Sequence, residues 1–264
     1  MTHLRLLLLF LAFLPGISYA QLAVFPEKVV FEPGQRSVRL NLQNRGNETY
    51  TYRIGWQDIV MDSLGLIKQV DDEKNPRKTP AASKMIRYAP RQVILEPGET
   101  QAVRVMLRRP ADLKDGEYRS HMLFQRLQTV KGINTPATAT TPGISMDLLI
   151  GTSIPVFVRQ GDGEADLEFN NLELKKKEGK YFLNMQVERK GLYSSRAVVN
   201  LYEDGNNVPV MMSVQVMYTD NDRYTYSIPV QNSAAIDRNK KYILEIEYNL
   251  RNGEKQLVRK NISI

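Results

Sequence analysis

The sequence of 264 residues contains no cysteine, one tryptophan and only two histidines, His3 and His121. Without cysteine there can be no disulfide bond and no thiol catalysis, so hydrophobic packing has to hold the fold together. Two histidines cannot build a histidine metal cluster, a Ser-His-Asp triad would have to use His121, and the sequence has no G-x-S-x-G nucleophile elbow. We therefore expect a protein that is not an enzyme and that binds no metal and no cofactor.

The chain has a single long apolar run, Leu6 to Leu14, close to its N-terminus. Arg5 precedes this run, and Ala20 ends a small-residue cleavage site. About nine apolar residues cannot cross a hydrocarbon core about 30 Å thick, and this order of features is typical of a secretory signal peptide. We predict that residues 1–20 are removed and that the exported chain begins at Gln21 without a membrane span. An uncleaved N-terminal anchor is the alternative.

The distribution of charge does not indicate a polyanionic partner. Lys and Arg number 36 against 29 Asp and Glu, which gives a formal net charge of +7. The basic residues are scattered among acidic neighbours, apart from "LKKKEGK" at 174–180, which is typical of a solvated hairpin end. We therefore expect no nucleic-acid partner.

Short segments of alternating apolar and polar residues recur along the chain, and residues that favour turns separate them. This pattern is typical of β-sandwiches, whose strands each bury one face, and no window sustains a helical stripe. The length suits two sandwiches of ordinary size. We predict an all-β protein with an immunoglobulin-like domain over residues 21–160 and a C-terminal β-sandwich domain over residues 161–264.

The segment "ISMDLLIGTSIPVFVR" at 144–159 has the alternation of a long strand. Pro155 cannot donate to a ladder, which predicts an edge strand, and an apolar edge strand is an aggregation hazard unless something covers it. The Thr-, Ala- and Pro-rich residues 130–143 before it predict a loop. Two interpretations of its first half are open: its alternating residues either pack in the first domain or serve a partner. These residues are Ile144, Met146, Leu148 and Ile150.

Beyond Thr152, the same strand has a second set of alternating apolar residues. We expect Ile154, Val156 and Val158 to pack in the core of the first domain. His121 and Trp56 are expected to be core or edge residues.

Five motifs of the first half occur in a fixed order, after the predicted signal peptide and before a second cysteine-free β domain. They are "FPEKVVFEPG", "LNLQNRG", "YAPRQVILEPGETQAVRVMLRR", "DGEYRSHMLF" and "IPVFVR". With these motifs the chain resembles the periplasmic pilus-assembly chaperones of the PapD-like superfamily.

The resemblance implies two immunoglobulin-like sandwiches in an L-shaped arrangement and a location in the periplasm. It also implies a chaperone that stabilises pilus or fimbrial subunits by donor-strand complementation and delivers them to an outer-membrane usher. The chaperone lends a strand to the incomplete subunit, and its alternating side chains fill the subunit's groove. Ile144, Met146, Leu148 and Ile150 would be these donor residues. A free chaperone that hides the strand in a self-capping dimer is also possible.

The resemblance further implies two basic residues that bind the subunit's C-terminal carboxylate in the cleft between the domains. Lys28 in "PEKVVF" occupies the position of the first, where arginine is usual, so the bidentate fork is absent. The second is a lysine in the last strand, and an ungapped alignment on "IPVFVR" places Pro155 there. Proline cannot bind a carboxylate, so Arg119 in "GEYRSHM" is the candidate substitute.

The alternative function is that of a structural or adhesive β-sandwich protein of the cell surface. A pilin would be expected to be one shorter domain, and a carbohydrate-binding tip would need clustered aromatic and amide side chains. The sequence has neither feature.

Overall fold

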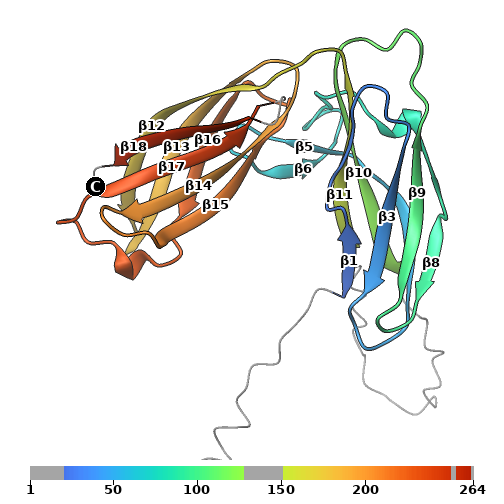
Figure 1. Ribbon diagram of the computed structural model, residues 1–264, viewed down its shortest axis with the longest axis horizontal. Helices are drawn as coiled ribbons and strands as arrows, with labels where there is room; N and C mark the ends of the chain where they lie inside the picture. Colours follow the sequence, from blue (N-terminus) through green and yellow to red (C-terminus); the bar gives the residue numbers. More distant parts are fainter. Residues whose placement is uncertain (1–20, 128–150, 251–253, 263–264) are drawn as a thin grey trace, which may run out of the picture.

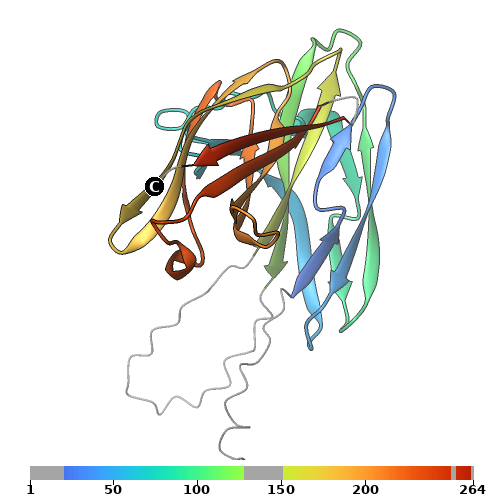
Figure 2. The same ribbon diagram turned by 60° about the vertical axis from the view of Figure 1, so that its left-hand side comes forward.

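The computed structural model describes residues 21–127, 151–250 and 254–262, and these residues form two β-sandwiches with two 3₁₀ turns (η1, Ser83–Met85; η2, Ser233–Ala235). The sandwiches meet at an angle, as an L (Figures 1 and 2). The predicted all-β, two-sandwich fold is confirmed. Within the described ranges no helix is long and apolar enough to cross a membrane.

The first sandwich packs a four-stranded sheet, in the order β1-β3-β9-β7, against a five-stranded sheet, in the order β2-β11-β10-β4-β8. The alternation in the sequence sets the two faces of each strand, so that Leu40 and Leu42 of β3, for example, are fully buried. The strands are β1 (Leu22–Phe25), β2 (Val29–Phe31), β3 (Ser37–Asn44), β4 (Tyr50–Gln57), β7 (Ile86–Ala89), β8 (Gln92–Leu95), β9 (Thr100–Leu107), β10 (Gly116–Leu127) and β11 (Gly151–Gln160).

Strand β11 has two neighbours over only part of its length. It pairs with β10 throughout, from Gly151 opposite Gln125 onward, but its pairing with β2 begins only at Val156. The described part of β11 before Val156 therefore has one free edge, and Pro155 lies in this part, as is usual for a proline in a sheet. This placement agrees with the edge position predicted for Pro155.

Three alternate residues in the middle of β11 face the core of the first sandwich. Ile154, Val156 and Val158 are buried, as expected from the sequence. The four predicted donor residues lie outside the described residues. They are Ile144, Met146, Leu148 and Ile150.

The second sandwich packs the sheet β12-β13-β16 against the sheet β15-β14-β17-β18. The hairpin end expected at 174–180 is present, because Glu178 and Gly179, both with positive φ, form the two-residue turn between β12 and β13. The predicted boundary between residues 160 and 161 falls between β11 and β12. The strands are β12 (Asp166–Lys177), β13 (Lys180–Lys190), β14 (Ser195–Glu203), β15 (Pro209–Met217), β16 (Arg223–Pro229), β17 (Tyr242–Asn249) and β18 (Lys255–Ile262).

A small hairpin of the first sandwich reaches across to the second (Figure 1). It consists of β5 (Ile59–Met61) and β6 (Ile67–Gln69). Met61 packs into the core of the second sandwich, and the carbonyl of Ser63 accepts the N–H of Thr225 in β16 at 2.7 Å. The hairpin therefore joins the two sandwiches and covers part of the edge strand β16.

Candidate functional site

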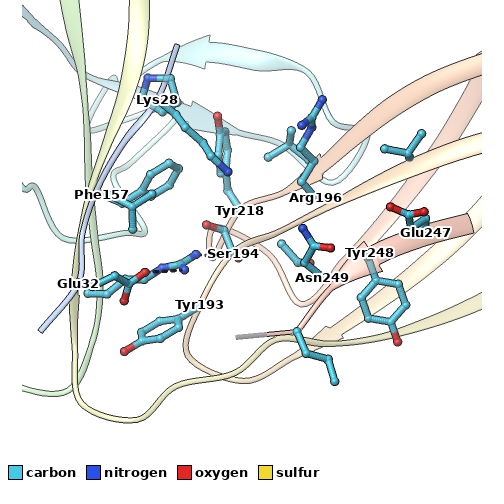
Figure 3. Close-up of a pocket in the computed structure, with 17 residues that line it drawn as sticks. Lys28, Glu32, Phe157, Tyr193, Ser194, Arg196, Tyr218, Glu247, Tyr248 and Asn249 are labelled. Atoms are coloured by element: carbon cyan, nitrogen blue, oxygen red, sulfur yellow. Dashed lines mark hydrogen bonds and ion pairs between the residues drawn. The ribbon is translucent and has the colours of Figure 1, made fainter. Parts of the chain in front are cut away.

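A cleft of about 410 Å³ lies where the two sandwiches meet, and residues of both line it (Figure 3). The first sandwich contributes residues at the start of β2 and along β11, and the second contributes residues of β14, β15 and β17. The residues used below are Lys28, Glu32, Pro155, Phe157, Arg159, Ser194, Arg196, Val198, Val216, Tyr218 and Glu247.

Strand periodicity explains why β11 serves both the core and the cleft. Successive side chains of a strand point to opposite faces of the sheet. Because Val156 and Val158 face the core, Pro155, Phe157 and Arg159 face the cleft. The same alternation in and around β2 buries Val29 and Phe31 and brings Lys28 and Val30 to the cleft.

A buried carboxylate helps to fix the two walls of the cleft. The side chain of Glu117 is fully buried, accepts a hydrogen bond from Nε of Arg159 at 3.2 Å and accepts another from the hydroxyl of Ser194 at 2.5 Å. Nη2 of Arg159 donates to the carbonyl of Ser194 at 3.2 Å, and its Nη1 lies 3.3 Å from Glu32. Since Ser194 belongs to the second sandwich, its bonds to Glu117 and Arg159 cross between the sandwiches. The charge of Arg159 is already paired with Glu117 and Glu32 of its own sandwich.

Arg119, the second anchor candidate from the sequence, does not line the cleft. Its guanidinium is buried and donates to Asp220 of the second sandwich at 2.6 Å. The guanidinium also lies 3.9 Å from the centre of the Tyr218 ring. Arg119 therefore lies on the strand that adjoins β11, as expected, but its side chain lies in the interior of the junction between the sandwiches.

Asp220 accepts further hydrogen bonds from residues of the first sandwich. Its carboxylate accepts the N–H of Met61 at 2.9 Å and the hydroxyl of Thr79 at 2.8 Å. Each of these bonds joins residues more than a hundred positions apart, so the whole group forms only when the sandwiches dock. The pair Arg119–Asp220 is the centre of that junction.

Two basic side chains of the cleft, Lys28 and Arg196, form no ion pair with a described acidic residue. Lys28 extends from the start of β2 and Arg196 from β14, and Figure 3 shows the Lys28 ammonium pointing toward the middle of the cleft. Partial burial lowers the pKa of Lys28, and the positive charges of Arg196 and Arg159 lower it further. In the described part of the chain no acidic residue forms an ion pair with Lys28 or Arg196, while Glu247 is paired with Lys255 at 2.7 Å. The cleft therefore favours an anion.

His121 is buried and Trp56 is partly buried against the core of the first sandwich, as expected for core or edge residues. His121 of β10 is buried close to the Tyr218 ring, and Trp56 packs edge-to-face on Tyr88. Burial, followed by the charge of Arg119, lowers the pKa of His121 to about 4, although Asp220 and Asp58 act in the opposite direction. His121 is therefore neutral at pH 7.

No family model matches the chain, and no curated protein matches it. Among solved structures, it is similar to the Acinetobacter baumannii CsuC–CsuE complex of a chaperone and a tip adhesion subunit, at 14% identity and a TM-score of 0.47, over 92% of this chain and 99% of that one. It is similar to the E. coli chaperone DraB at 11% identity and a TM-score of 0.46, over 92% and 96% of the two chains.

A third similar structure is the Salmonella enterica SafA pilin in complex with the SafB chaperone, at 11% identity and a TM-score of 0.42, over 94% of this chain and 99% of that one. All three structures contain a chaperone.

The buried ion pair gives a first prediction. Asp220→Ala leaves Arg119 buried without its partner, and removing one member of a buried pair costs about 3–5 kcal/mol. Lys240→Ala, which breaks the exposed pair with Glu203, should change the stability far less, because water solvates both charges of an exposed pair. Urea unfolding of both variants measures the difference. Equal losses in the two variants would show that the buried pair does not hold the junction.

A second prediction concerns pH. Burial holds the pKa of His121 at about 4 in the folded protein, whereas the unfolded chain should have the ordinary value of 6.5. As pH falls below 6.5, His121 becomes protonated in the unfolded chain but stays neutral in the folded protein. The free energy of unfolding therefore decreases between pH 6.5 and 4. The loss between pH 7.5 and 5 should be about 2 kcal/mol. His121→Gln should remove this part of the pH dependence in urea unfolding, and an unchanged slope would contradict the assignment.

Proposed function

We propose that this protein is a periplasmic chaperone of pilus or fimbrial subunits, and that it acts by binding rather than by catalysis. The observation that carries the proposal is the free edge of β11 before Val156, beside a cleft that favours an anion. An exposed sheet edge can pair with an extended segment of another protein through main-chain hydrogen bonds. The basic cleft provides a second contact, which would fix the register of that segment.

The donor strand of this proposal is the segment directly before Gly151. Ile144, Met146, Leu148 and Ile150 alternate in the sequence, as side chains that fill successive pockets of a subunit groove would. Burial of four such side chains is worth roughly 6 to 12 kcal/mol before ordering and association costs. The four residues share their parity with the buried Ile154 and Val156, so a core role is the alternative that the test has to exclude.

In this proposal the anchor for the subunit's C-terminal carboxylate is Lys28 together with Arg196. Both line the cleft, and they come from different sandwiches, so a carboxylate between them would be held from two sides. Hydrogen bonds between charged groups in a partly desolvated site are stronger than neutral ones. Arg196 replaces Arg119 in this role, because the guanidinium of Arg119 is already paired with Asp220.

The remaining steps of the proposal follow from the chaperone role. The mature chain, beginning at Gln21, would hold subunits in the periplasm and deliver them to an outer-membrane usher. A dimer that caps the donor strand is the expected resting form if the free strand is not otherwise covered.

Co-expression with the neighbouring pilin-like open reading frames, followed by pull-down from periplasmic extract, tests the anchor. Lys28→Ala with Arg196→Ala should leave the fold intact, because neither side chain belongs to the core of a sandwich, and should weaken subunit capture at least tenfold. Arg39→Ala, on the opposite sheet of the first sandwich, is the matched control. Capture by the double variant at the level of the control would exclude this pair as the anchor.

Two substitutions in the donor segment separate function from stability. Met146→Thr with Leu148→Thr should hardly change the thermal midpoint but should abolish protection of the subunit from periplasmic proteolysis. If these residues were core residues, the change would cost on the order of 4 kcal/mol and lower the midpoint by roughly 10 °C. Val156→Thr, at a fully buried position of β11, shows the size of a true core effect. If the double variant lowered the thermal midpoint as much as Val156→Thr does, Met146 and Leu148 would be core residues and not donor residues.

A further inference from the structure

Strand β15 is an edge strand that is protected only at its start, by Pro209 and by a register shift against β14 between Leu201 and Tyr202. It is nine residues long, "PVMMSVQVM", and carries no charged side chain. It pairs with β14 on one side, and among the described residues no strand pairs with its other side. Proteins usually protect such edges with charges, bulges or a covering segment.

The other edges of the second sandwich have these protections. Strand β12 carries charges along its length and a register shift between Asn170 and Glu173. Strand β18 carries lysine and arginine. The β5–β6 hairpin covers part of β16, where Ser63 accepts the N–H of Thr225. Among the described edges of this domain, β15 therefore differs in having neither charged side chains nor a covering segment, and from Met211 onward it is open to a partner.

The outer face of β15 is apolar. Directly opposite residues of paired strands point to the same face, and the register places Val216 opposite Arg196 and Val214 opposite Val198. Met212 continues the same face and is 64% exposed, while Val214 is 42% exposed. Val198, Met212, Val214 and Val216 together form an apolar strip on the outside of this sheet.

The strip is continuous with the cleft. Val198 and Val216 line the cleft beside Arg196, and Val214 and Met212 continue the strip away from it along β15. In Figure 1, β14 and β15 lie on the lower side of the second sandwich, toward the inside of the angle between the two sandwiches. A protein whose C-terminal end lay in the cleft would therefore meet the strip next.

We propose that the apolar strip is a second docking surface for the subunit whose carboxylate the cleft binds, so that the C-terminal sandwich contacts an apolar patch of the subunit. This inference rests on the proposed function. A second copy of this chain is a poorer occupant, because pairing two β15 edges side by side extends the sheet and leaves its outer face uncovered. The strip needs a partner that lies against the face, as a subunit seated in the cleft does.

The test uses Met212→Gln with Val214→Thr, which remove apolar surface while nearly keeping the shapes of the side chains. A control carries the same kinds of change, Met106→Gln and Ile94→Thr, at exposed positions of the first sandwich on strands β9 and β8. Subunits captured from the co-expressed pilin-like reading frames are measured by pull-down and by dissociation rate. We expect about tenfold weaker capture by the strip variant and no change in the control.

Each outcome has a distinct meaning. Weakened capture by the strip variant alone supports the docking surface. Equal capture by the strip variant and the parent overturns it and leaves the chaperone function standing. A parent protein that captures no subunit overturns the proposed function and this inference with it. Analytical ultracentrifugation of the free protein adds a further check, because a parent dimer that the strip variant abolishes would make the strip a contact between copies and overturn the inference.

Discussion

The buried ion pair between Arg119 and Asp220 is the constraint on which the arrangement of this protein depends. Asp220 accepts hydrogen bonds from Met61 and Thr79 as well as from Arg119, so one carboxylate of the second sandwich satisfies three donors of the first. A buried ion pair is weak evidence for net stability, but removing one partner leaves an unpaired buried charge and strongly lowers the free energy of unfolding. The two sandwiches are therefore held in one relative orientation, and the cleft between them has defined walls.

The defined walls account for the chemistry of the cleft. Glu117 holds Arg159 in place and also accepts a hydrogen bond from Ser194 on the opposite wall. The charge of Arg159 is therefore already neutralised within the protein. Lys28 and Arg196 then face the same space from different sandwiches. The lowered pKa of Lys28 has burial as its main cause and Arg196 as the next, and an anion between the two would relieve that repulsion.

The sequence allowed the strands to be predicted because the period of two survives in strands that bury one face, such as β3 and the second half of β11. It did not allow the β5–β6 hairpin to be predicted, since its strands are three residues each and Met61 is buried by the other sandwich. Nor could local pattern show that Arg119 pairs with a residue 101 positions away. In the sequence, Arg196 has the pattern of an ordinary exposed strand residue. Only the docking of the two sandwiches brings it to the same cleft as Lys28.

The central claim is that the cleft binds a carboxylate at the end of a partner chain. A synthetic peptide with the C-terminal residues of a captured subunit, prepared as the free acid and as the amide, tests this claim by titration calorimetry. We expect the free acid to bind the parent protein at least tenfold more tightly than the amide, and to lose most of this advantage in the Lys28→Ala, Arg196→Ala variant. Equal affinity of the parent protein for the acid and the amide would contradict the account.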